Sequence, residues 1–308
     1  KPKMVRISTM YAFQRSLDAM NDRRTSLLGV QEQMATGKRL NSPSDDPVNA
    51  AMAERTRAQV ARIELERRMM NHASGMLAQA ENAMGNAGEV LQLVREKLVA
   101  AGSTTLSPQD RALIGQQVRQ LRDELLSIAN LRDGAGGYVF GGQGTADAPF
   151  TSAATPTFGP NAGEQSTGTD LSFTTVQDGR AIFQDLSAGG TPQSIFKTLD
   201  DVTALLEDTS APSDTVIAGV QTAMSGVDNA MERLLLKRTQ AGEQLRALES
   251  RASLLETGEL QARGQLSDLV DLDYAAAISQ FQNEQTALNA AMSTYAQISR
   301  MSLFDYLR

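Results

Sequence analysis

Apolar residues recur at intervals of seven along most of this 308-residue chain, and this spacing limits its fold more than any other feature. The repeat is clearest in six large side chains, Ile63, Met70, Leu77, Met84, Leu91 and Leu98. Smaller residues occupy the companion row three positions on, at Ala73, Ala80, Ala87 and Val94. A sevenfold repeat is typical of a long helix packed on a second helix, and the small row lets that partner approach closely. We therefore predict one long helix here, which ends at Gly102.

A heptad pattern also marks both ends of the chain. Near the N-terminus its apolar positions are Met10, Phe13, Leu17, Met20, Leu27 and Met34. Near the C-terminus they are Tyr274, Ile278, Phe281, Leu288, Met292 and Tyr295. A helix of this kind is marginal in water without a packing partner. We therefore expect the two terminal helices to pair with each other or to pack against neighbouring chains.

Two further long helices are expected between these segments. One begins at Ser107, which is a good N-cap residue, and Pro108 suits its first turn. The short link before it predicts that it folds back antiparallel on the preceding helix. The other covers residues 215–269, and a shorter helical segment at 194–208 precedes it.

The stretch from residue 35 to 53 is rich in residues that interrupt helices, and it contains an adjacent pair of aspartates. Such a pair could begin a calcium loop, but the alternating carboxylates and terminal Glu of an EF-hand are missing. We interpret the stretch as a joint between two helices, in which Ser44 or Asp45 caps the second helix and Pro47 falls in its first turn. A break in the apolar register near 271–273 predicts a matching joint. The hinge and cap positions are Gly37, Asn41, Pro43, Ser44, Asp45, Asp46, Pro47, Asp271 and Asp273.

The character of the sequence changes between residues 133 and 196. A glycine-rich run at 134–144 precedes a stretch rich in Thr, Ser, Gly and Pro. The run lacks the Lys-Ser/Thr of a P-loop and the strand–helix context of a dinucleotide site. Residues 171–176 and 181–183, on either side of a turn at 177–179, predict a β-hairpin. We therefore expect a small β-containing insertion.

The composition argues against several classes of function. The net charge of −7 is unsuited to a nucleic-acid partner. Cysteine is absent and the only histidine, His72, faces away from the predicted seam, so catalytic triads and metal clusters have few residues to draw on. No apolar run approaches the roughly 18 residues of a membrane span, and the basic N-terminus lacks the apolar core of a secretory signal peptide. We expect no enzyme site, no cofactor, no metal and no membrane partner.

Together these patterns predict a mainly α protein. Its paired N- and C-terminal regions would form a long helical bundle or coiled coil, with a small inserted β-containing domain. Aromatic residues make up only 5% of the chain, which suits thin layers of helix packed on helix. The predicted domains are a terminal coiled-coil domain at 1–40 plus 274–308, a helical bundle at 41–132 plus 197–273, and an outer insertion at 133–196.

Four segments of the chain resemble the ends of flagellin-superfamily proteins. They are MVRISTMYAFQRSL (4–17), QMATGKRLNSPSDDPVNAAMA (33–53), DYAAAISQFQNEQTALNAAMSTYAQIS (273–299) and SLFDYL (302–307). Flagellins themselves usually carry DDAAGLAI-like residues after the acidic pair. The DDPVNAA here, the SLFDYL ending and the GGYVFGG…PF at 136–150 are similar instead to the hook-associated junction members of the superfamily.

This resemblance implies a structural subunit that joins the hook to the filament of the bacterial flagellum. The paired ends would form an inner layer around a central channel, and residues 133–196 would project outward. The resemblance also implies export to the cell exterior through the flagellar type III apparatus, with a chaperone that binds near the C-terminus. The expected neighbours are further copies in a ring, an adjacent junction protein on the hook side, and flagellin or the second junction protein on the filament side.

Two alternatives stay open at this point. The chain could be a filament-forming flagellin of the same architecture. It could also be a helical surface enzyme or adhesin whose activity lies in residues 133–196.

Overall fold

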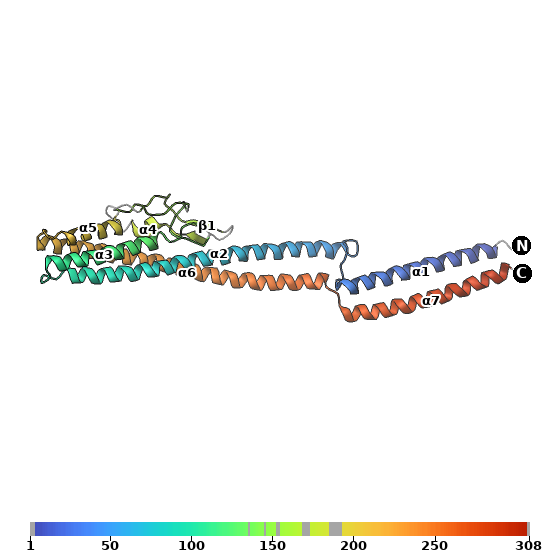
Figure 1. The fold of residues 1–308 in the computed structure, drawn as a ribbon. Helices are drawn as coiled ribbons and strands as arrows, with labels where there is room; N and C mark the ends of the chain where they lie inside the picture. The colour runs from blue at the N-terminus through green and yellow to red at the C-terminus, as the bar shows by residue number, and fades with distance from the viewer. Residues whose placement is uncertain are drawn as a thin grey trace. The chain divides into compact units, whose positions relative to one another are not determined.

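The computed structural model describes residues 4–134, 136–144, 146–151, 155–167, 173–184 and 193–306. The chain is mainly α with a small antiparallel sheet, which confirms the predicted fold class. In chain order the elements are α1 (Met4–Thr36), α2 (Pro47–Ala101), α3 (Pro108–Ala129), β1 (Gln165–Thr167), β2 (Phe173–Val176), α4 (Gly179–Phe183), α5 (Ile195–Glu207), α6 (Ser213–Val270) and α7 (Tyr274–Tyr306) (Figure 1). Contacts divide the chain into two units, one containing residues up to 64 and from 256 onward, and the other containing residues 65–255.

In the first unit, α1 and α7 lie side by side (Figure 1). Val30 of α1 and Ala277 of α7 are buried, each with 4% of its surface exposed. The guanidinium of Arg23 donates to both carboxylate oxygens of Glu284, at 3.2 and 3.4 Å. The predicted terminal helices therefore pair with each other within one chain.

The second unit is a helical bundle built from α3, α5 and the adjoining parts of α2 and α6 (Figure 1). The sevenfold row of α2 is buried as its spacing predicts, at Met70, Leu77, Met84, Leu91 and Leu98, and so is the small companion row at Ala73, Ala80, Ala87 and Val94. The predicted start of α3 is confirmed, because Ser107 Oγ accepts the Asp110 N–H at 3.1 Å and Pro108 is the first helical residue. His72 is exposed.

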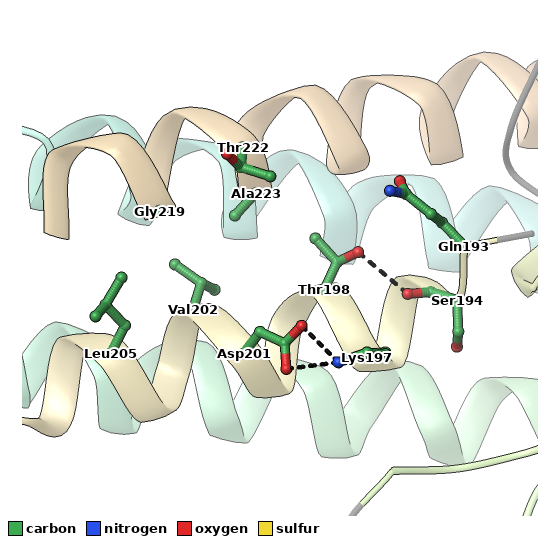
Figure 2. Close-up of a pocket in the computed structure, with 10 residues that line it drawn as sticks. All are labelled: Gln193, Ser194, Lys197, Thr198, Asp201, Val202, Leu205, Gly219, Thr222 and Ala223. Carbon is green, nitrogen blue, oxygen red and sulfur yellow. Dashed lines mark hydrogen bonds and ion pairs between the residues drawn. The ribbon is translucent and has the colours of Figure 1, made fainter. Parts of the chain in front are cut away.

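Glycines on its neighbours let α5 pack closely in this bundle. A Cβ atom on Gly115 of α3 would lie 3.1 Å from Glu207 Cγ, and one on Gly226 of α6 would lie 2.8 Å from Thr198 Cγ2. Thr198 is β-branched, and its hydroxyl donates to the Ser194 carbonyl at 3.1 Å (Figure 2). The side chain is therefore held in place, and Gly226 is a position where only a hydrogen atom fits.

A groove of about 330 Å³ lies beside this contact, between α5 and α6 (Figure 2). Its lining includes the apolar side chains of Val202, Leu205 and Ala223, and Lys197 at its edge pairs with Asp201 at 2.8 Å. Thr198 and Gly219 line the same groove.

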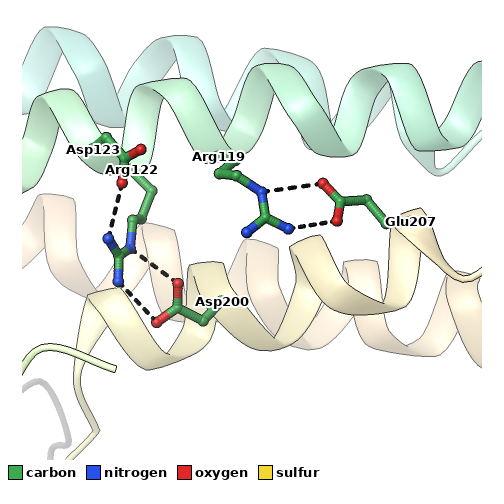
Figure 3. Close-up of polar contacts among 5 residues, drawn as sticks. All are labelled: Arg119, Arg122, Asp123, Asp200 and Glu207. Atoms are coloured by element: carbon green, nitrogen blue, oxygen red, sulfur yellow. Dashed lines mark hydrogen bonds and ion pairs between the residues drawn. The ribbon is translucent and has the colours of Figure 1, made fainter. Parts of the chain in front are cut away.

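Two ion pairs connect α3 to α5 (Figure 3). Arg122 contacts the Asp200 carboxylate at 2.9 and 3.2 Å, and only 10% of the Arg122 side chain is exposed. Arg119 pairs with Glu207 through two nitrogens, but 56% of its side chain is exposed. Burial raises the pKa of the Asp200 carboxyl, and the hydrogen bond from Arg122 offsets part of that effect. Removing the Arg122 side chain would therefore leave the partly buried Asp200 carboxylate without these hydrogen bonds.

The inserted region is held together by aromatic rings. Phe150 contacts Phe183 and Phe196, with ring centroids 5.8 and 5.1 Å apart, and Phe140 meets Phe183 edge to face at 5.4 Å. The backbone of Phe150 is bound on both sides by the side-chain amide of Asn130, at 2.9 and 3.0 Å. The ring cluster thus joins the end of α3 to the start of α5.

The predicted hairpin around residues 177–179 is wrong. Strand β2 pairs with the upstream strand β1, and the residues after the turn form helix α4. The physical reason is Asp178, whose carboxylate caps α4 by accepting the Arg180 N–H at 2.9 Å and also accepts the Gly163 N–H at 2.8 Å. Residues 171 and 172 of the predicted first strand lie outside the described residues.

We expect Gly226→Ala to lower the free energy of unfolding by about 1 to 2 kcal/mol, because the new methyl group clashes with Thr198. Gly242→Ala on the same helix is the matched control. Nothing lies within 4 Å of a Cβ there, so that variant should gain about 1 kcal/mol of helix propensity. Urea unfolding followed by circular dichroism measures both, and equal effects of the two substitutions would contradict the close approach of α5.

We also expect Arg122→Met to destabilise the protein by about 2 kcal/mol, because it removes hydrogen bonds to a carboxylate that burial already penalises. Arg119→Met, whose ion pair is mostly solvated, should cost less than about 1 kcal/mol. The same urea titration distinguishes them. A cost for Arg119→Met that equals or exceeds that of Arg122→Met would show that burial is not what separates these pairs.

Candidate functional site

The pair formed by α1 and α7 leaves part of its apolar surface uncovered. Of the predicted seam residues, Leu17, Met20, Leu27, Met34, Phe281, Leu288 and Tyr295 are half-buried, whereas Tyr274, Ile278 and Met292 are exposed. The side chains of Met10 and Phe13 lie outside those that the structure describes. Tyr11 and Leu28 of α1 are also exposed, at 64% and 54%. Exposed apolar side chains gathered on one helix pair mark a surface that another molecule can cover.

The half-buried row of α7 differs from the row picked out by large apolar residues. It runs at alternating steps of four and three from the buried Ala277 through the half-buried Phe281, Glu284, Leu288, Ala291 and Tyr295. Sequence reasoning missed three of these positions because two are alanine and one is charged. A helix that approaches closely needs small residues, and Glu284 is matched by Arg23, so the row is recognised only once its partner helix is known.

The two predicted joints lie against each other. The Arg39 N–H donates to the Val270 carbonyl at 2.7 Å, and the Leu272 N–H donates to the Gly37 carbonyl at 3.1 Å. These bonds place Lys38 opposite Asp271 in a short antiparallel bridge. The link between α1 and α2 and the link between α6 and α7 therefore share backbone hydrogen bonds, although more than 200 residues separate them in the sequence.

Gly37 ends α1 in the left-handed conformation, with φ of 70°. Its N–H donates to the Gln33 carbonyl at 2.9 Å, which closes the last turn of the helix. A Cβ atom there would lie 3.1 Å from the Tyr274 hydroxyl, and this hydroxyl donates to the Met34 carbonyl at 3.4 Å. The glycine thus permits both the turn and the close approach of α7.

Arg39 connects more elements than any other side chain described at the joint. Its guanidinium donates to the Leu269 carbonyl in the last turn of α6 at 2.6 Å, and it lies 3.7 Å from the Asp46 carboxylate. Its own carbonyl accepts a bond from the Gln33 side chain at 2.9 Å. A cation is favourable at a helix C-terminus, so Arg39 complements α6 while it contacts the cap of α2.

The cap of α2 is Asp46, and not Ser44 or Asp45 as predicted. Asp46 accepts the Asn49 N–H at 3.0 Å and the Asn49 side-chain amide, and Pro47 is the first helical residue. Asp45 instead closes the preceding turn by accepting the N–H groups of Asn41 and Ser42, at 3.0 and 2.8 Å. The two aspartates therefore bind different backbone groups.

The remaining joint residues also have local structural partners. The Asn41 side chain accepts the Thr36 hydroxyl at 2.8 Å, and the hydroxyls of Ser42 and Ser44 lie 2.8 Å apart around Pro43. On the other joint, Asp271 accepts the Ser267 hydroxyl at 2.6 Å. Asp273 caps α7 by accepting the N–H groups of Ala275 and Ala276, at 2.9 and 3.2 Å.

A groove of about 850 Å³ runs beside the joint, with Leu40, Ala50, Ala53 and Val270 among its lining residues. Within the described part of the chain, no three carboxylate, histidine or cysteine side chains come together as metal ligands would. None of the described helices combines the length and apolar character needed to cross a bilayer. The geometry of the joint is that of a structural connection between helices.

We expect the Asp46 cap to weaken as the solution is acidified. Hydrogen bonds from Asn49 hold the pKa of Asp46 below its ordinary value of 3.8. The ionised carboxylate therefore adds stability at pH values above 3.8, and this stability is lost as the pH falls through the lowered pKa. The chemical shift of the Asn49 amide, followed by NMR, should titrate with a midpoint below 3.8 in the native chain and lose this titration in Asp46→Asn. A midpoint at or above 3.8 would contradict the cap.

Residues 7–145 match the family model of the bacterial flagellin N-terminal helical region. Flagellar hook-associated protein 3 of Salmonella typhimurium is 31% identical over 99% of this chain and 100% of its own length. The Escherichia coli protein of the same name is 31% identical over 98% and 99%. In fold, the chain is similar to a flagellar hook-associated protein of Vibrio parahaemolyticus, with a TM-score of 0.67, 20% identity and coverage of 74% of this chain and 100% of that one. This chain belongs to the flagellar hook-associated protein 3 family and is a helical structural subunit of the bacterial flagellum.

Proposed function

We propose that this chain joins the hook to the filament of the bacterial flagellum and is assembled there through its terminal helices. The single observation that carries the proposal is the apolar surface that α1 and α7 leave uncovered after they pair. Ile278 and Met292 remain 44% and 45% exposed. Membership of the hook-associated protein 3 family supports the location.

The occupants of this surface are proposed to be neighbouring copies of the chain in a ring. Three of the six positions in this row of α7 are alanine or glutamate, so α1 alone buries little apolar area. Each further contact with a neighbour adds about 25 cal/mol per Å² of apolar surface removed from water. The terminal helices would therefore become fully ordered only when neighbours arrive, as segments that fold on binding do. An adjacent junction protein would lie on the hook side, and flagellin or the second junction protein on the filament side.

Export is proposed to occur through the flagellar type III apparatus, with the chain unfolded and a chaperone bound near its C-terminus. Helices that depend on partners for stability suit such a route, because little folding free energy opposes their opening. The low charge of α7 and its many glutamines and asparagines suit a helix with one face on neighbours and another on a hydrated channel. The role is proposed to be structural, without catalysis.

We expect Ile278→Asp to prevent assembly without unfolding the isolated chain, because a charge placed on an already solvated face costs little until a neighbour covers it. Ser279→Asp, at the next exposed position, is the matched control and should assemble normally. Both variants are produced in a bacterium that lacks its own hook-associated protein 3, and attached filaments are counted by electron microscopy. Circular dichroism of the purified proteins checks folding.

Normal filament number with Ile278→Asp would refute a neighbour on this face. The purified native chain also distinguishes the junction role from that of a filament-forming flagellin. If seeded protein elongates into long filaments, the chain is a filament-forming flagellin. If it adds only a short zone at the hook end, the junction role stands.

A further inference from the structure

We propose that the two joints form a single clasp, held together by the side chain of Arg39, and that this clasp fixes the register in which α1 and α7 pair. The clasp consists of Gly37, Lys38 and Arg39 on one side and residues 269–274 on the other. It deepens the proposed function, because it assigns to the joint the task of aligning the helices that would carry assembly. The joint is thereby one closed element and not two independent hinges.

The need for such a device follows from the seam itself. A helix pair with a sevenfold repeat can slip by one repeat and still place apolar residues opposite one another. The α1–α7 seam is only half-buried, so its apolar contacts discriminate weakly between registers. One ion pair, between Arg23 and Glu284 at 3.2 Å with 51% of the Arg23 side chain exposed, is too weak to decide the register by itself.

Three contacts at successive positions along the α1–α7 pair are all consistent with one antiparallel register. Arg23 faces Glu284, the Tyr274 hydroxyl reaches the Met34 carbonyl, and Lys38 lies opposite Asp271. The last contact is made by backbone groups, through two hydrogen bonds at 2.7 and 3.1 Å. Slipping α7 along α1 would break both bonds, because the donors and acceptors have fixed positions in the chain.

The side chain of Arg39 connects the clasp to the end of α6 and to the start of α2. Its guanidinium bond to the Leu269 carbonyl holds the end of α6, and its position 3.7 Å from Asp46 holds the start of α2. The same residue provides the backbone N–H that binds Val270. Loss of the side chain would therefore loosen both strands of the bridge at once.

The test uses the absence of cysteine from the chain. Lys38 and Asp271 form a non-hydrogen-bonded antiparallel pair, whose Cα atoms lie about 4.5 Å apart in such bridges, so Lys38→Cys with Asp271→Cys should oxidise to an intrachain disulfide. Lys38→Cys with Asp268→Cys, one turn earlier in α6, is the off-register control. Arg23→Cys with Glu284→Cys reports the register of the helices. Each pair is combined with Arg39→Gln or with Arg55→Gln, an exposed arginine on α2.

Disulfide formation is measured by mass spectrometry on the purified chain and on isolated flagella. The 38–271 pair should oxidise faster than the off-register pair. Arg39→Gln should slow both the 38–271 and the 23–284 pairs about tenfold, as expected for the loss of one charged hydrogen bond, whereas Arg55→Gln should slow neither.

The proposal is overturned if the 38–271 pair forms no faster than the off-register pair in either sample. It is equally overturned if Arg39→Gln slows the 38–271 pair but leaves the 23–284 pair unchanged, since the clasp would then not set the register. Absence of the chain from flagella would count against the proposed function alone, because the purified chain still decides whether the clasp forms.

Discussion

The burial of one sevenfold row on α2 is the interaction on which the rest of this structure depends. Leu77, Met84 and Leu98 have no exposed surface at all. Because each buried leucine or methionine contributes about 1.5 to 3 kcal/mol, the bundle can hold close helix contacts and an inserted region. Among the described side chains of α1 and α7, by contrast, the buried apolar ones are only Val30 and Ala277.

This contrast in burial explains the different ways in which the two units are stabilised. In the bundle, apolar contact dominates, and the ion pairs range from the largely buried Arg122 with Asp200 to partly exposed pairs such as Arg238 with Glu81. At the joint, backbone bonds and side-chain caps replace apolar contact, and nearly every polar side chain there binds a named partner. A region with little core must fix its geometry by directional interactions, because the hydrophobic effect is not directional.

The sequence predicted what depends on local chemistry or on large side chains. The rows of α2, the Ser107 cap and the positions of both joints follow from spacing and from helix-interrupting residues, and all are found.

Three features could not be predicted, because they depend on contacts that the spacing of residues does not show. Asp45 and Asp46 are chemically identical, so their different partners depend on how the loop closes. Gly179 could begin a turn or a helix, and the cap that Asp178 provides decided it. The small residues of the α7 row have no hydrophobic signature. The pairing of the two joints was also outside sequence reasoning, because it joins segments at opposite ends of the chain.

Helix α5 has a consequence for protein engineering. Its glycine contacts make it part of the bundle, whereas Phe196 in its first turn belongs to the ring cluster of the inserted region. A boundary for replacing that region with a foreign domain therefore cannot be drawn at the last irregular residue before α5. A graft that removes Phe150 and Phe183 but keeps Phe196 would leave an aromatic side chain without its partners on the bundle surface. The replacement must either supply new rings or substitute Phe196 by a polar residue.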